Sequence, residues 1–553
     1  MPDTITVNIT GAGEHAVPCN ISLYELSKKF PHICKKPILA AKVNNELQDS
    51  MLRPVPYDST IEFLDITDPH GFRAYQRGVS FMMICAAKEI LGKTTRVVVA
   101  HSINKNYYCE LPDLKIPITD ELLHEIEGFM LGLVEKDLPI EKHTMPKEMA
   151  IKIAEDLGLE DKVRLLKYRH NHTVSFYKLG WMYNYFYGGM PPGTGRLDLF
   201  KLVRRSHGFM LQFPDASHDY ELAEMIPAAR VAEVFAESNQ WARIMKADTV
   251  GALNDKLCKD GGREIIKVAE ALQEKKIALL ADQIEKEHRP IVLIAGPSSS
   301  GKTTFASRLG VQLRVNGVVP HIISLDNYYL NREDCPQDEF GNYDLETIDA
   351  IDTNQIASDM KALLDGKRVE IPTFNFLTSK REYKGNFLKL SPRDVLIMEG
   401  IHGLNEKTSA GVPASDKFKI FISALTQINV DDHNRIPTTD ARLLRRMVRD
   451  YLYRGASAAD TIGMWPSVLR GEAKYIYPFQ EHADAFFNSA LVYEMCVLKQ
   501  YAEPLLYGIT PSQPQYTEAR RLIQFLSSFL SVPSETIPPN SILREFVGGS
   551  SFH

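Results

Sequence analysis

Residues 296–303 constrain this chain more than any other segment. They read Gly-Pro-Ser-Ser-Ser-Gly-Lys-Thr, which fits the pattern GxxxxGK[ST], and they follow the continuous apolar run 291–295. A stretch with helical spacing comes next and ends at Asn316-Gly317. In this pattern the glycines let backbone N–H groups turn inward around phosphate oxygens, where a Cβ would obstruct them. The order of strand, loop and helix favours a nucleotide-binding site over a glycine turn that contains a lysine by chance.

The loop and the start of its helix have expected partners on a nucleoside triphosphate. Lys302 is expected to reach the β- and γ-phosphates, and the hydroxyl of Thr303 is expected to bind Mg²⁺. The helix that follows points its positive N-terminal end at the same anion. The expected nucleotide-binding residues are Gly296, Pro297, Ser298, Ser299, Ser300, Gly301, Lys302, Thr303 and Thr304.

Four continuous apolar stretches after position 290 predict a parallel sheet that helices cover on both faces. They are residues 291–295, 321–325, 395–398 and 418–424. In such a sheet the carboxyl ends of neighbouring strands open into one crevice.

Two of these stretches end in a carboxylate. Asp326 follows the second stretch and could take a proton from an attacking hydroxyl, although it could also cap a helix or a turn. Glu399 closes the third stretch, at the position where an acidic residue holds Mg²⁺ directly or through water. Its alternative role is that of a buried salt-bridge partner.

Residues 442–454 contain five arginines, at positions 442, 445, 446, 449 and 454. On a helix, positions 442, 446 and 449 share one face, and a polyphosphate would offset their mutual repulsion. Arginine spreads its charge over several donors, which suits a phosphoryl group in transfer. The alternative is a solvated helix whose arginines pair with acids such as Asp440 and Asp450.

Composition and charge exclude several classes of protein. The 553 residues carry 64 Lys plus Arg against 70 Asp plus Glu, a net charge of -6, which argues against a nucleic-acid coat or a polybasic membrane binder. A local basic groove stays compatible with this total. The longest apolar run is about seven residues, against the ~20 that span a bilayer. The start shows no secretory signal, and the seven cysteines are scattered, which together favour a reducing cytoplasm.

The chain divides into five segments with different patterns, for which we expect a multidomain α/β and α+β fold. Residues 1–66 suggest a β-grasp module, because an alternating strand at 4–9 is followed by a short helix and two further apolar stretches. Residues 67–215 mix α and β signals, and residues 216–287 are helical and charge-rich, as in a connector. Residues 288–510 carry the parallel sheet, and residues 511–553 a helix and a tail.

Residues 290–495 resemble the uridine kinase and phosphoribulokinase branch of P-loop kinases. The motifs that carry the resemblance are the P-loop, SxDxYY at 324–329, Tyr343-Asp344, IPTFNF at 371–376, Glu399-Gly400 and RRMVRDYLYRG at 445–455. The resemblance implies ATP- and Mg²⁺-dependent phosphorylation of a sugar-type hydroxyl, typically the 5′-hydroxyl of a nucleoside.

The same resemblance implies roles for individual residues. Asp326 would be the catalytic base, and Lys302, Arg446 and Arg449 would act on the transferring phosphoryl group. Positions on the side of the acceptor are Tyr329, Asp344, Phe374, Arg446, Arg449 and Arg454, and the metal would lie at Thr303 and Glu399.

The chain departs from pyrimidine nucleoside kinases where those enzymes read the base. Phe374 and Ser379 stand where they carry a Tyr and a His, and a later Gln is replaced near Met464-Trp465. A site that reads a base by hydrogen bonds needs such partners, so the departures weaken the expectation of pyrimidine selectivity.

Residues 1–215 resemble the N-terminal half of threonyl-tRNA synthetases, which consists of a TGS domain and an editing-type domain. That editing domain carries four metal-ligating or catalytic positions, and they correspond here to Arg77, Phe81, Phe186 and Met190. Because these residues cannot form a ligand set, the resemblance predicts a pocket without metal and without editing activity.

These patterns favour a cytoplasmic ATP:nucleoside phosphotransferase that acts on a uridine- or cytidine-like acceptor, and they leave two alternatives. A P-loop kinase could use another small alcohol, such as a sugar phosphate. A nucleotide-gated RNA-binding or regulatory protein could use the synthetase-like half to hold RNA, but the first 66 residues hold six basic against eight acidic side chains. No membrane partner is expected, and an oligomer is compatible with the sequence.

Overall fold

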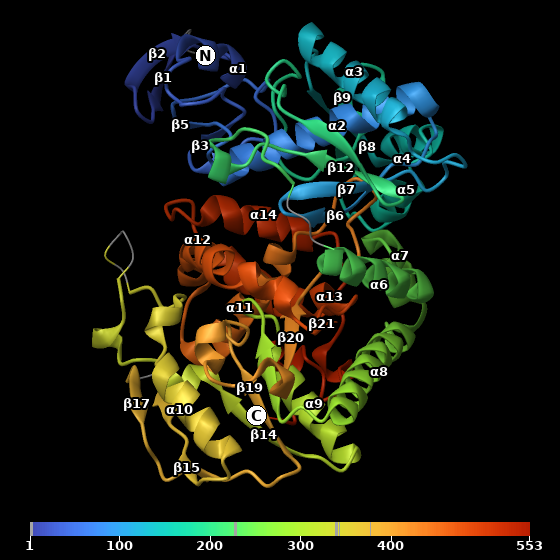
Figure 1. Cartoon of the computed structure of the whole chain (residues 1–553). Coiled ribbons are helices and arrows are strands. Elements are labelled where there is room, and N and C mark those ends of the chain that lie inside the picture. Colours follow the sequence, from blue (N-terminus) through green and yellow to red (C-terminus); the bar gives the residue numbers. More distant parts are fainter. Residues whose placement is uncertain (1–3, 226–228, 338–340, 342, 376–377, 553) are drawn as a thin grey trace.

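The computed structural model describes residues 4–225, 229–337, 341, 343–375 and 378–552. Figure 1 shows the N-terminal half, from blue through teal to green, stacked on the C-terminal half, from yellow-green to red. The long green helix α8 (Arg263–Glu287) runs along one side of the lower half. Phe376, the last residue of the IPTFNF motif, lies outside the described residues.

Residues 4–64 fold into a mixed sheet of five strands in the order β2-β1-β5-β3-β4. The strands are β1 (Thr4–Ile9), β2 (Gly13–Pro18), β3 (Ala40–Val43), β4 (Glu46–Leu47) and β5 (Ser59–Leu64). Strands β1 and β5 are parallel, and the other pairs are antiparallel. Helix α1 (Leu23–Lys29) begins after a capping box at Ser22 and packs Leu23 and Leu26 into the core of the sheet. This arrangement is the expected β-grasp.

The next region combines a central helix with two antiparallel sheets. One sheet has the order β10-β9-β8 and the other the order β11-β12-β7-β6. The strands are β6 (Val98–Ile103), β7 (Asn106–Glu110), β8 (Glu141–Pro146), β9 (Thr173–Leu179), β10 (Met182–Asn184), β11 (Lys201–Arg205) and β12 (Gly208–Gln212). The helices are α2 (Pro69–Leu91), α3 (Asp120–Lys136), α4 (Lys147–Asp156) and α5 (Glu160–Lys167).

The apolar pattern of the sequence predicts a buried helix from Ser80 to Leu91, and α2 begins eleven residues earlier, at Pro69. Its start is fixed by local chemistry, because the Asp68 side chain accepts hydrogen bonds from the backbone N–H groups of His70 and Gly71, and Pro69 occupies the first helical position. The residues before Ser80 include polar ones that the rest of the fold buries, such as Gln76. Their burial depends on tertiary packing and leaves no apolar periodicity in the sequence.

Helices α6 (Ala229–Met245), α7 (Val250–Asp260) and α8 link the two halves. Helix α8 packs along α9 (Lys302–Val315), and Arg308 on α9 donates to Glu274 on α8 at 2.6 Å. The predicted connector therefore lies directly against the helix that follows the P-loop.

The C-terminal half is built on a five-stranded sheet whose neighbouring strands are all parallel, in the order β14-β19-β13-β20-β21. The strands are β13 (Ile291–Ala295), β14 (Val319–Ser324), β19 (Asp394–Glu399), β20 (Lys417–Ser423) and β21 (Ala485–Asn488). Two small antiparallel sheets of two strands each pair β15 (Val369–Glu370) with β18 (Phe387–Leu388) and β16 (Thr373–Asn375) with β17 (Lys380–Glu382). The remaining helices are α10 (Thr353–Leu364), α11 (Thr438–Arg454), α12 (Ala458–Tyr475), α13 (Glu494–Tyr507), α14 (Tyr516–Leu526) and α15 (Arg544–Val547). The predicted parallel sheet is thus confirmed.

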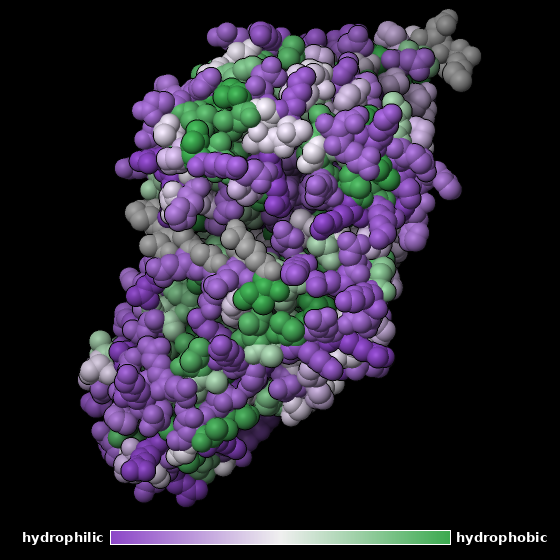
Figure 2. Space-filling view, turned by 90° about the vertical axis from the view of Figure 1, so that its right-hand side faces the viewer, coloured by the Kyte–Doolittle hydropathy of each residue, from purple (hydrophilic) through white to green (hydrophobic). Residues whose placement is uncertain are grey.

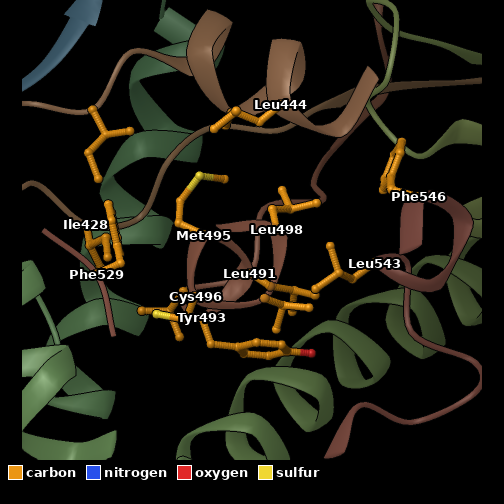
Figure 3. Close-up of a cluster of buried hydrophobic side chains, with 14 of the residues drawn as sticks. Ile428, Leu444, Leu491, Tyr493, Met495, Cys496, Leu498, Phe529, Leu543 and Phe546 are labelled. Atoms are coloured by element: carbon orange, nitrogen blue, oxygen red, sulfur yellow. The ribbon is translucent and has the colours of Figure 1, made fainter. Parts of the chain in front are cut away.

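Buried apolar side chains and ion pairs join the two halves. The largest hydrophobic cluster runs from Met145 in the upper half to Val547 near the C-terminus. Lys162 and Asp431, one from each half, form an ion pair at 2.6 Å with both side chains fully buried. Figure 3 shows part of the cluster, where Leu491, Met495 and Leu498 of the C-terminal half lie together. The two halves therefore share a continuous interior.

Hydrophilic residues cover most of the face in Figure 2, and the green hydrophobic patches on it are separate from one another. Among the described residues, no helix combines the length and the apolar character needed to cross a membrane.

Candidate active site

The P-loop lies between strand β13 and helix α9, at the carboxyl edge of the parallel sheet. Gly301 adopts a left-handed conformation with φ of +83°, which side chains other than glycine rarely adopt. The Nζ atom of Lys302 donates to the carbonyl oxygens of Gly296 at 3.1 Å and Pro297 at 3.2 Å. The lysine is thereby folded over its own loop, with its charge held at the centre of the phosphate cradle.

Thr303 and Glu399 meet at the same edge. The Thr303 hydroxyl donates to Glu399 Oε1 at 3.2 Å, although the two residues come from helix α9 and strand β19. Burial, together with the nearby charge of Asp326, raises the pKa of Glu399 to about 7. A hydroxyl and a carboxylate are oxygen donors of the kind that Mg²⁺ prefers, so this pair fits the metal that the P-loop implies.

Asp326 lies in the short 3₁₀ turn Leu325–Tyr328 that follows strand β14. Burial raises the pKa of its carboxyl, while the positive charges of Lys302, Arg454 and Arg449 act in the opposite direction. These charges can influence Asp326 only because they lie near it, so the structure brings Asp326, Lys302 and Glu399 into one site. A carboxyl with a raised pKa in a cleft is a candidate general base.

The five arginines of helix α11 fall into two groups. Arg442 and Arg445 are fully buried, and they pair with Glu472 on α12 and Glu494 on α13. Both arginines also donate to carbonyl oxygens of the P-loop, Arg442 to Ser298 at 3.2 Å and Arg445 to Ser299 at 3.4 Å, and so connect the loop to α12 and α13.

The other group faces the site and shares one acid. Arg446, Arg449 and Arg454 all pair with Asp450, at 3.1, 2.9 and 3.6 Å. Arg446 also donates to Ser298 Oγ in the P-loop at 3.0 Å. Asp440, which the sequence offers as a further partner for this helix, instead pairs with Arg521 of α14.

Of the aromatic residues expected on the acceptor side, Tyr329 lies within electrostatic reach of Asp326 and contacts Phe374. The Tyr329 and Phe374 rings are 5.7 Å apart between centroids, and the Tyr329 hydroxyl donates to the Leu345 carbonyl at 3.0 Å. Burial raises the pKa of Tyr329, and the neighbouring charge of Asp326 adds to the increase. Asp344 accepts the backbone N–H of Glu346 at 3.1 Å. Phe374 itself is held by its backbone N–H, which donates to the Asn327 side chain at 3.3 Å.

Sequence reasoning missed three carboxylates of this site. Glu346, two residues after Asp344, is within the electrostatic reach of Arg446 and Lys302, and burial raises its pKa to about 7. Glu472 accepts the backbone N–H of Ser298 in the P-loop at 3.1 Å. The third is Glu545, which accepts from Thr304. Only Glu346 lies beside one of the motifs, two residues after Tyr343-Asp344, so it alone had a sequence signal that could have identified it.

The four positions that correspond to the editing pocket of the synthetases form a packed interior. Phe81 and Phe186 have ring centroids 5.4 Å apart, and both belong to the same buried cluster as Met190. The Arg77 guanidinium donates to the Gly189 carbonyl at 3.0 and 2.6 Å. Aromatic and aliphatic side chains therefore fill the space between α2 and the loop 184–193.

Comparisons with known proteins agree with this geometry in the C-terminal half. Residues 291–494 match the model of the phosphoribulokinase/uridine kinase family. A uridine kinase of Ligilactobacillus salivarius is 28% identical over 201 residues, which is 36% of this chain and 85% of that protein. Uridine kinase-like protein 3 of Arabidopsis thaliana is 29% identical over 206 residues, or 36% of this chain and 40% of that protein.

The other similarity is to a different class of protein. A threonine–tRNA ligase of Acetivibrio thermocellus is 28% identical over 184 residues, which is 33% of this chain and 28% of that enzyme. The chain thus spans less than a third of the synthetase, whereas it spans most of the bacterial uridine kinase. The C-terminal half therefore contains a P-loop kinase domain of the phosphoribulokinase/uridine kinase family, and the region before it is similar to threonyl-tRNA synthetases.

Proposed function

We propose that this protein transfers the γ-phosphate of ATP to the 5′-hydroxyl of a uridine- or cytidine-like nucleoside. The observation that carries the proposal is the grouping of Asp326, Lys302 and Glu399 at one edge of the parallel sheet. The family of the kinase domain supports the reaction class, and the similarity to uridine kinases suggests the acceptor.

Asp326 is the proposed general base. Because burial raises the pKa of its carboxyl, it is a stronger proton acceptor than an exposed aspartate once it is ionised. Its place beside Tyr329 and Phe374 allows it to receive the proton of a hydroxyl bound against these rings. The oxygen of that hydroxyl then attacks the γ-phosphorus as the bond to the β-phosphate oxygen breaks.

The positive side chains hold and neutralise the phosphates. Lys302 is expected to exchange its loop carbonyls for phosphate oxygens, and Arg446 and Arg449 approach from helix α11. Thr303 and Glu399 would hold Mg²⁺, which supplies charge neutralisation when it is bound. Positioning and electrostatics account for most of the rate in this type of reaction, since the protein takes little part in covalent steps.

The acceptor side is proposed to consist of Tyr329, Asp344, Phe374 and Arg454. Phe374 offers a ring face and no hydrogen-bonding side-chain group, so a base bound there would be selected by stacking more than by its polar edge. We therefore expect broader use of nucleosides than a site with hydrogen bonds to the base would allow.

The test is a screen of ribo- and deoxyribonucleosides and small sugar alcohols with ATP, read by the mass of the product. A phosphorylated nucleoside is the expected product. Asp326→Asn should bind ATP as the wild type does but lose at least about 100-fold in turnover, because one general base contributes 10²–10⁴-fold. If only sugar alcohols are phosphorylated, the acceptor is a sugar alcohol and not a nucleoside. Normal turnover of Asp326→Asn would show that Asp326 is not the general base.

RNA binding is a second candidate function, suggested by the synthetase-like half. A cavity of about 950 Å³ lies on that half, and basic side chains border it, among them Lys115, Arg204, Arg205 and His207. A gel-shift assay with tRNA at increasing salt tests this function, since phosphate contacts weaken as salt rises. Tight, salt-sensitive binding that the double variant R204E/R205E abolishes would support it.

We also propose a division of the whole chain into five segments. They are a TGS-like domain in residues 1–66, an editing-like domain in 67–215, a connector in 216–287, the kinase domain in 288–510 and a C-terminal helix with a tail in 511–553. A cytoplasmic location fits the free state of the cysteines, which form no disulfide among the described residues.

A further inference from the structure

A P-loop and the helix after it bind phosphates with backbone N–H and hydroxyl groups. In this chain two such groups already donate hydrogen bonds to a carboxylate of the same protein. Thr304 is the third residue of helix α9, and its backbone N–H donates to Glu545 Oε2 at 3.2 Å. Its hydroxyl donates to the same oxygen at 2.8 Å. Glu545 comes from helix α15, 241 residues further along the chain. The C-terminal segment therefore reaches the phosphate-binding end of α9.

The N–H groups in the first turn of a helix form an anion site because they lack partners within the helix and lie at its positive end. The Thr304 N–H is one of these groups. It can donate a hydrogen bond to Glu545 or to a phosphate oxygen, but not to both at once. A carboxylate in this place is favoured by the helix dipole for the same reason as a phosphate. Its negative charge also opposes a triphosphate that approaches the same turn.

The segment that carries Glu545 is firmly anchored. Ile542, Leu543 and Phe546 are fully buried, and Figure 3 shows Leu543 and Phe546 at the edge of the cluster that contains Leu491 and Leu498. Arg544 donates to the carbonyl oxygens of Ser534 and Ile537 at 2.9 and 2.8 Å. The anchored backbone delivers the Glu545 carboxylate to α9 at a high effective concentration.

A second contact links the segment to the loop itself. Ile542 lies so close to Gly301 that its Cγ2 atom would be 2.5 Å from a Cβ at that position. Glu545 also raises the pKa of Glu399, which places its charge near the expected metal position. The side chain of Glu545 is only half-buried, so it can rotate away from Thr304 while the apolar anchors stay in place.

We propose that the C-terminal segment 541–548 is a built-in competitor for nucleotide phosphates, with Glu545 occupying the Thr304 donors until ATP displaces it. The proposal rests on the proposed function in one respect, namely that a nucleoside triphosphate is the ligand of this P-loop. It gives the C-terminal segment a regulatory role, because any change that turns Glu545 away from α9 raises the affinity for ATP.

The test compares Glu545→Gln with the wild type and with the control Glu535→Gln. Glutamine keeps the shape of the side chain and removes its charge, and Glu535 is an exposed glutamate of the same tail. Dissociation constants are measured for ATP, for inorganic tripolyphosphate and for adenosine, with turnover measured in parallel. We expect Glu545→Gln to bind ATP and tripolyphosphate at least about fivefold more tightly, since the neutral amide accepts a weaker hydrogen bond from Thr304 and no longer repels the phosphates. Adenosine affinity should stay the same, as should all values of Glu535→Gln.

Several outcomes would overturn the proposal that Glu545 competes with nucleotide phosphates. Equal ATP affinity of Glu545→Gln and the wild type would show that Glu545 does not compete, and weaker binding would show that it supports the loop as a helix cap. An equal gain for adenosine would show a general change of the site. If Glu545→Gln fails to fold, Glu545→Asp takes its place in the test. Its side chain keeps the charge but is shorter and cannot reach Thr304 as well, so this variant must bind ATP and tripolyphosphate more tightly than the wild type.

The outcomes also separate the two proposals. If the wild type phosphorylates nucleosides and Glu545→Gln binds ATP no more tightly than the wild type, only the proposal that Glu545 competes with ATP is wrong. Tighter ATP binding by Glu545→Gln, with no phosphorylated product from either protein, supports the competitor and overturns the transfer reaction. If neither protein binds ATP or tripolyphosphate, both proposals are wrong.

Discussion

The Thr303 hydroxyl and Glu399 Oε1 form a hydrogen bond of 3.2 Å, although the two residues are 96 positions apart in the chain. The sequence predicts both residues as metal ligands for independent reasons. Thr303 ends the P-loop pattern, and Glu399 follows an apolar strand. Strands β13 and β19 are hydrogen-bonded neighbours in the parallel sheet, and this pairing sets the two side chains at the same edge. The contact is therefore a consequence of strand order.

Glu399→Gln should raise the Mg²⁺ concentration needed for half-maximal turnover. An amide binds Mg²⁺ less well than a carboxylate, and changes around a metal site cost about 10- to 100-fold in affinity or activity. The measurement is turnover against total Mg²⁺ at saturating ATP. Glu285→Gln, at an exposed position on α8, is the matched control. An unchanged Mg²⁺ profile for Glu399→Gln would exclude the residue from the metal site.

Arg446→Ala should lower kcat more than it raises the KM for ATP. The guanidinium contacts Ser298 in the P-loop, and we propose that it acts on the transferring phosphoryl group, where its charge is most valuable when negative charge develops. We expect a loss of about 100-fold in kcat, in line with the removal of one donor from such a site. Steady-state kinetics measure both constants. A rise in KM with normal kcat would instead assign Arg446 to ground-state binding.

Glu346→Gln should stabilise the protein at pH 8 and leave its stability unchanged near pH 4. The pKa of Glu346 is raised to about 7 in the folded protein, so the folded state holds this proton more tightly than the unfolded state does. The favourable contribution is present at low pH and is lost as pH rises from about 4.5 to 7. At pH 8 the ionised, buried carboxylate opposes folding, and its removal should add about 1–3 kcal/mol to the free energy of unfolding.

Urea unfolding of the wild type and Glu346→Gln at several pH values measures this difference. A constant difference at every pH would mean that packing, and not the ionisation of Glu346, causes it. The activity of the variant gives a separate result, because Glu346 lies within electrostatic reach of Arg446 and Asp326.

Phe81→Ala should destabilise the N-terminal half by about 3–5 kcal/mol, the usual cost of removing a buried aromatic ring. Phe81 is fully buried against Phe186, so its removal leaves a cavity in the core around α2. Leu131→Ala is the control, since that leucine is 43% exposed on α3. Urea unfolding followed by fluorescence measures both variants. A cost below about 1 kcal/mol would show that this space is a loosely filled pocket.

Much of the kinase domain follows from local patterns. Strands β13, β14 and β19 and helix α9 lie within two or three residues of where the apolar runs and the Asn-Gly end signal predict them. Parallel packing then places Asp326 and Glu399 beside the P-loop, which is why these residues could be predicted together. The placement of Tyr329 near Phe374 was predicted only through the resemblance to known kinases.

The partners of the arginines could not be predicted in the same way. Helical spacing shows that positions 442, 446 and 449 share a face, yet Arg442 is fully buried against Glu472, whereas Arg446 is partly exposed and pairs with Asp450. Which arginine becomes buried depends on how α11 packs against α12 and α13. Side-chain periodicity reports one helix at a time and contains no information on the neighbouring helices.

The sequence by itself determined the phosphate-binding loop, the parallel sheet around it and the carboxylates at its edge, because each depends on short segments with strong local patterns. Only the tertiary structure decided that Glu545 contacts Thr304 and that Phe81 meets Phe186. Both contacts join positions far apart in the chain, and they form through packing of apolar surfaces whose choice of partner no local pattern specifies.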